Sequence, residues 1–205
     1  MNNNRFMLGL AGFISGVLSL TFSWLLFNVG FLLDSSKSDL HFVYYAYGES
    51  LWQFLPGVFF GLIIGTYMSH HFKVSKINIF FWTLTSIFAY IAAFIATAVG
   101  GFGGVSPFLT ELIREPISLF VGSSIGSLIV VLGFNSFIFK LTGKQKSFLV
   151  LVGGLLGLIN AWMSLLELNM FFTSTGKPSL FLLITWPTVI AFFLGYFLDK
   201  NSSVE

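Results

Sequence analysis

Residues 147–172, SFLVLVGGLLGLINAWMSLLELNMFF, are the stretch from which the fold can be predicted. Small and polar residues recur in it at steps of three or four, and this spacing places them on one face of a helix: Gly153, Gly157, Asn160, Ser164 and Glu167. Apolar side chains occupy the other faces. A carboxylate in the middle of a membrane costs about 2.5–3.5 kcal/mol, so we expect the polar face to point into the protein rather than at lipid.

The composition of the whole chain agrees with a membrane location. Of its 205 residues, 56% are hydrophobic and only 9% are charged, whereas roughly a quarter of a soluble domain is charged. We therefore predict an all-α membrane protein. The net charge of +2 and the lack of a basic, aromatic-rich stretch argue against nucleic acid as a partner. The absence of cysteine excludes disulfides and thiolate metal sites.

Six apolar segments are long enough to cross a hydrocarbon layer about 30 Å thick. They cover approximately residues 6–33, 51–69, 77–99, 117–141, 147–172 and 180–198. A cleaved signal peptide is the alternative for the first segment, but the apolar part of a signal peptide has only about 7–15 residues. We predict one transmembrane domain, residues 1–205, folded as a compact bundle of six helices.

Two connections contain signals for short helices that lie on the membrane surface. Ser106 and Pro107 suit the first positions of a helix between the third and fourth spans. Ser38 is suited to cap another one between the first and second spans. Ser50 and Gln53 have the spacing of a capping box, which predicts that the second span begins there.

Stripes of Gly, Ala and Ser run along the predicted spans. Lipid provides no hydrophobic driving force between helices, so we expect these stripes to form close helix contacts. The glycines assigned to such packing are Gly9, Gly12, Gly16, Gly57, Gly61, Gly65, Gly122, Gly126, Gly153 and Gly157.

The distribution of basic residues predicts the orientation. With six spans, one side of the membrane holds seven Lys and Arg: Arg5, Lys73, Lys76, Lys140, Lys144, Lys146 and Lys200. The other side holds three, at Lys37, Arg114 and Lys177. The positive-inside rule then predicts a multi-pass protein of the cytoplasmic (inner) membrane with both termini in the cytoplasm.

Glu167 is the leading candidate for a functional residue. It lies about 20 residues into its helix, or roughly 30 Å along the axis, near the outer edge of the hydrocarbon. The residues that we expect to bind a solute with it are Asn160, Ser164, Arg114, Glu111, Glu115 and Gln53. The alternative is that Glu167 reaches the headgroups or forms a structural ion pair.

Catalysis is not expected. Ser123, Ser124 and Ser127 resemble an intramembrane nucleophile, but no predicted span contains a histidine to act as base. His70 and His71 are neighbours that point about 100° apart on a helix, which is a poor metal site. We predict no catalytic residue, no metal and no cofactor.

Two functions remain. The chain is either a transport component that binds or passes a small solute from the external side, or a scaffold or accessory subunit of a membrane complex. In size and number of spans it is similar to the substrate-binding subunits of vitamin importers, which work with a separate ATPase. As a scaffold it would dock on another membrane protein, or on a second copy of itself, through small-residue faces such as that of the first helix.

Overall fold

The computed structural model describes residues 3–34, 38–99, 111–165 and 180–202. The elements are α1 (Asn4–Asp34), α2 (Ser38–Phe72), α3 (Lys76–Val99), α4 (Glu111–Gly133), the short π-helix η2 (Phe134–Ile138), α5 (Gly143–Leu165) and α6 (Leu180–Ser202). These ranges contain no β-strand. The prediction of an all-helical chain is confirmed, as expected for a backbone that must satisfy its own hydrogen bonds in hydrocarbon.

Within the described residues, five helices contain a stretch that is long and apolar enough to cross a membrane. These stretches are Asn4–Phe22, Lys76–Thr97, Pro116–Ile138, Gly143–Met163 and Leu182–Lys200. The outer surface of the bundle carries large apolar side chains, for example Phe80, which is 62% exposed, and Trp162, which is 59% exposed. Together these features indicate a multi-pass membrane protein.

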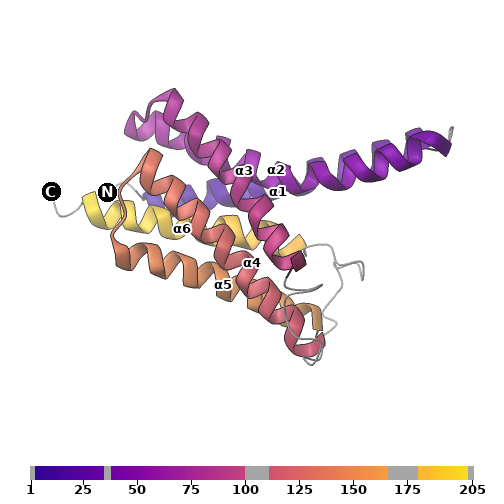
Figure 1. Ribbon diagram of the computed structural model, residues 1–205. Coiled ribbons are helices and arrows are strands. Elements are labelled where there is room, and N and C mark those ends of the chain that lie inside the picture. The colour runs from indigo at the N-terminus through magenta and orange to yellow at the C-terminus, as the bar shows by residue number, and fades with distance from the viewer. Residues whose placement is uncertain (1–2, 35–37, 100–110, 166–179, 203–205) are drawn as a thin grey trace.

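The helices pack in a closed ring. Each of α1 to α5 contacts the next helix along the chain, and α6 joins α5 to α1. The contact of α6 with α1 is the most extensive, so the two ends of the chain lie side by side (Figure 1). The end of α1 and the beginning of α2 form an arm that extends away from the other helices (Figure 1).

Two glycines lie close to the backbone of a neighbouring helix. A Cβ atom on Gly16 of α1 would lie 2.7 Å from the carbonyl oxygen of Leu183 in α6. A Cβ atom on Gly57 of α2 would lie 2.6 Å from Cα of Ile87 in α3. Both separations are too short for a Cβ atom unless the neighbouring backbone shifts.

Local sequence explains several helix ends. Ser75 caps α3, since its hydroxyl accepts a hydrogen bond from the Asn78 backbone N–H at 3.3 Å. Thr142 and Gln145 form a capping box for α5, with Thr142 N–H donating to Gln145 Oε1 and Gln145 N–H donating to Thr142 Oγ1. This box makes α5 begin at Gly143, four residues before the predicted start. Lys73, with φ of 54°, ends α2 in the left-handed conformation.

The second helix differs from the prediction. In place of a surface helix from Ser38 and a separate span from Ser50, α2 runs without interruption from Ser38 to Phe72. The prediction that Ser50 and Gln53 form a capping box is wrong. A cap requires a non-helical residue, and Ser50 lies inside the helix. Pro56 lies inside α2, where its missing N–H removes a single helical hydrogen bond.

The fourth span also differs in its boundaries. Ser106 and Pro107 lie outside the described residues, and Glu111 already belongs to α4, which continues through Pro116 instead of starting after it. At the other end the helix stops at Ile138, before the predicted Leu141. The reason is that Asn135 Oδ1 accepts the Leu141 backbone N–H at 3.0 Å, which holds the following chain in an extended path.

Candidate functional site

The small-residue face of α5 is turned toward α4. A Cβ atom on Gly157 would lie 2.5 Å from Ser123 Oγ, and Gly153 lies against Ser127. Gly154, one position further round, lies against Ser124. The three serines that resemble a nucleophile in the sequence therefore face the glycines of a neighbouring helix.

Asn160 is the first polar side chain beyond these glycines. It lies three residues after Gly157 on the same face, and its side chain is only 4% exposed. On α4, Ser118 is buried as well, at 2% exposed. Polar groups on both helices are thus kept away from the lipid-facing surface, as the sequence predicts for the α5 stripe.

The remaining predicted solute-binding residues are described incompletely. Glu167 lies outside the described residues. The backbones of five others belong to described helices, but their side chains do not: Ser164 in α5, Arg114, Glu111 and Glu115 in α4, and Gln53 in α2. Among the predicted solute-binding residues, Asn160 is therefore the one whose side chain belongs to the described part of the structure.

An aromatic cluster that sequence reasoning missed fills the centre of the ring. Phe60 of α2 lies 5.9 Å, between ring centroids, from both Trp82 of α3 and Trp186 of α6. Trp82 also contacts Phe134 at 5.5 Å, and Trp186 contacts Tyr90 at 5.2 Å. We call these five residues the central aromatic cluster; it joins α2, α3, η2 and α6.

One polar atom of this cluster has a hydrogen-bond partner among the described residues, and two others have none. The Trp186 indole N–H donates to Ser127 Oγ at 3.1 Å, in a buried position. Trp82 Nε1 and the Tyr90 hydroxyl are buried and have no hydrogen-bond partner among the described residues. The sequence contains one signal for this site: Trp82, Ser86 and Tyr90 recur every four residues along one face of α3.

A group of hydrogen bonds joins the start of α1 to the end of α6. The Asp199 carboxylate of α6 accepts the backbone N–H groups of Asn4 at 3.3 Å and Arg5 at 3.2 Å, and the Asn4 side-chain amide at 2.8 Å. Tyr67 of α2 donates its hydroxyl hydrogen to Asn4 Oδ1 at 2.8 Å. Asp199 thus supplies the N-terminal cap of α1 from another helix.

The two histidines lie near this junction. The ring of His71 lies 4.5 Å from that of Tyr67 and 5.1 Å from that of His70, between centroids. In the described part of the chain, no group of three or more His, Asp or Glu side chains has an arrangement that could hold a metal ion.

Comparison of the chain with protein-family models, with curated proteins and with solved structures finds no match, so the assignment of function depends on the residues themselves.

Proposed function

We propose that this protein is a non-catalytic transport component of the cytoplasmic membrane, which binds a small solute in a pocket between the outer parts of α4 and α5. The observation that carries the proposal is that the polar stripe of α5 faces α4 and leads to the buried Asn160. A stripe that faced lipid would rule out such a pocket.

The register between α4 and α5 supports the composition of the pocket. The two helices are antiparallel neighbours, so each step of four residues forward along α5 corresponds to about four residues backward along α4. Gly153 lies against Ser127 and Gly157 against Ser123. Continued at the same rate, the register brings position 164, one residue before the end of α5, to the level of Pro116, within one helical turn of Arg114 and Glu115. We propose that Glu167 and Arg114 face the solute there, with Glu115 and Gln53 at the rim.

We further propose six crossings, with α2 as the sixth beside the five apolar stretches, held together by the Gly, Ala and Ser stripes. Both ends of the chain lie at the end of the bundle that carries Arg5 and Lys200, which supports a cytoplasmic position for both. The pocket then opens to the outside. We propose that a solute passing on from the pocket displaces side chains of the central aromatic cluster.

The test is solute binding by the purified full-length protein. Thermal melting in detergent is measured with a panel of small polar metabolites, and a ligand at about 100 times its Kd adds roughly 2.7 kcal/mol of stability. Glu167→Gln, which removes the charge but keeps the shape, is expected to weaken binding of the hit about tenfold or more. Ser147→Ala, an exposed position at the other end of α5, is the control and leaves binding unchanged.

Two results would contradict the proposal. One is a panel in which no solute stabilises the protein. The other is a ligand that binds Glu167→Gln as tightly as the natural protein.

A scaffold or accessory subunit is the second candidate, and the projecting arm of α1 and α2 favours it. The α1 face with Gly9, Gly12 and Gly16 is covered by α6 of the same chain, so a partner must use another surface. Leu25, 43% exposed, lies in the outer half of α1. If the protein purifies in a fixed ratio with a membrane partner that Leu25→Trp releases, and no solute binds, the scaffold function replaces the transport function.

A further inference from the structure

Eight charged side chains are described at the end of the bundle where α1 begins and α6 ends. Seven of them are basic: Arg5, Lys73, Lys76, Lys140, Lys144, Lys146 and Lys200. One is acidic, Asp199, whose carboxylate caps α1. The described side chains of this end, which we call the basic end, carry seven positive charges and one negative charge, a sum of +6.

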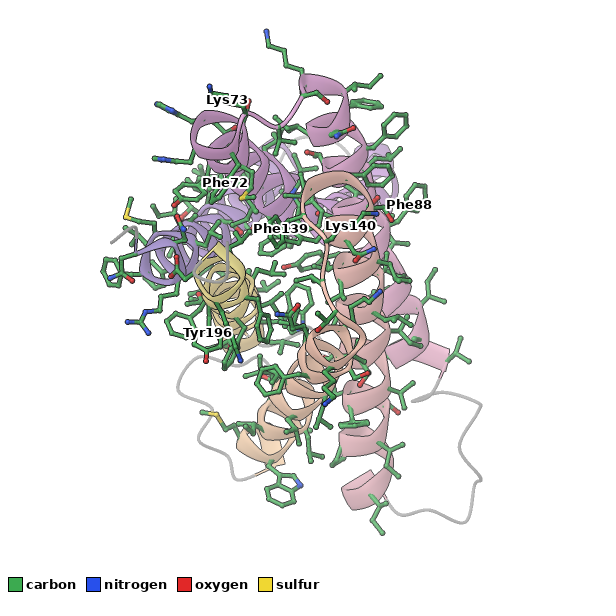
Figure 2. The ribbon with its side chains drawn as sticks, turned by 90° about the vertical axis from the view of Figure 1, so that its left-hand side faces the viewer. Phe72, Lys73, Phe88, Phe139, Lys140 and Tyr196 are labelled. Atoms are coloured by element: carbon green, nitrogen blue, oxygen red, sulfur yellow. The ribbon has the colours of Figure 1, made fainter. Side chains whose placement is uncertain are left out.

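The basic residues surround the end rather than forming one patch. They come from the start of α1, the connection between α2 and α3, the connection between η2 and α5, and the end of α6. Figure 2 looks onto this end and shows Lys73 and Lys140 beside Phe72 and Phe139, which pack against the core. In this view Lys140 lies beside Phe139 toward the middle, and Lys73 lies nearer the upper edge.

Exposed apolar side chains begin within one helical turn of these charges. Phe6, next to Arg5, is 61% exposed, and Ile77, next to Lys76, is 63% exposed. Phe148 is exposed two residues after Lys146. Arg5, Lys76 and Lys146 therefore stand where the lipid-facing surface ends, and the flexible stems of Lys and Arg can reach the headgroup layer from there.

From this arrangement we infer that the basic end binds anionic phospholipids, with the phosphate groups on the Lys and Arg side chains and the acyl chains on the adjacent apolar surface. An acidic protein would match the charge but not the apolar belt beside it. A phospholipid such as phosphatidylglycerol matches both. The inference needs only the membrane location and does not depend on the solute pocket.

The experiment measures the lipid selectivity of the full-length protein. The protein is reconstituted in phosphatidylcholine bilayers with a trace of spin-labelled phosphatidylglycerol or phosphatidylcholine, and electron paramagnetic resonance gives the fraction of each probe held at the protein. We expect phosphatidylglycerol to be held roughly fivefold more strongly or better, with the preference falling as salt is raised.

Substitutions of lysines test whether the preference for phosphatidylglycerol arises at the basic end. K144Q/K146Q removes two of the seven basic charges and is expected to lower the preference by a factor of roughly two, whereas K144R/K146R keeps it. The matched control is K37Q/K177Q, which removes the same charge from the connections after α1 and before α6 and leaves the preference unchanged.

Equal binding of the two probes by the natural protein overturns the inference, and so does a preference that K37Q/K177Q removes and K144Q/K146Q does not. Loss of a co-purifying acidic protein on K144Q/K146Q, with the lipid preference intact, also overturns it in favour of a protein partner. Melting of each variant in detergent shows whether it is folded. If K144Q/K146Q does not fold, the salt dependence of the natural protein decides the question.

Discussion

At the scale of single residues, the bond from the Trp186 indole N–H to Ser127 Oγ is the buried polar contact inside the central aromatic cluster. Ser127→Ala leaves the indole donor without a partner among apolar groups, so we expect the free energy of unfolding to fall by about 1 kcal/mol. In a Trp186→Phe background there is no donor to strand, and the same substitution should cost almost nothing. Unfolding in mixed micelles of the four proteins of this cycle measures the difference. Equal costs in both backgrounds would show that the hydrogen bond does not contribute.

At the scale of helices, the spacing between α2 and α3 depends on Gly57. Its missing side chain leaves room for the Ile87 backbone, with 2.6 Å between a Cβ at position 57 and Ile87 Cα. Gly57→Ala should therefore push the two helices apart and lower stability by about 1–3 kcal/mol, even though Ala favours the helix. Gly9→Ala is the matched control, because the nearest atoms, on Phe192, lie at an ordinary 3.4 Å. Thermal melting compares the two, and an equal effect would mean that helix propensity rather than close approach sets the result.

At the scale of the whole molecule, Asp199 ties the last helix to the first and so closes the ring. Asp199→Ala removes three hydrogen bonds and the negative charge at the start of α1, and we expect a loss of about 1–2 kcal/mol. Asp199→Asn keeps one acceptor oxygen and should cost less. Tyr67→Phe removes one bond to Asn4 from the same junction and should be the mildest of the three. The order of melting temperatures checks this ranking, and an Asn variant as unstable as the Ala variant would contradict the capping role.

The sequence by itself determined the class of the protein and most of its helices. Long uncharged segments must form helices in hydrocarbon, because no other open structure satisfies the backbone there. The predicted ranges 77–99 and 180–198 accordingly match α3 and α6 closely. Local hydrogen bonds determined other ends, as at Ser75.

Only the tertiary structure decided how these helices are arranged and what they bury. The capping motif at Ser50 reads the same whether or not the residues before it are helical, so the sequence could not reveal that α2 is continuous. Likewise, the α5 stripe predicts an inward face but not that α4 is its neighbour. The pairing of Trp186 with Ser127 joins residues 59 positions apart, and no local pattern encodes it. Such contacts depend on which helices lie side by side in the ring, and packing over the whole molecule sets that choice.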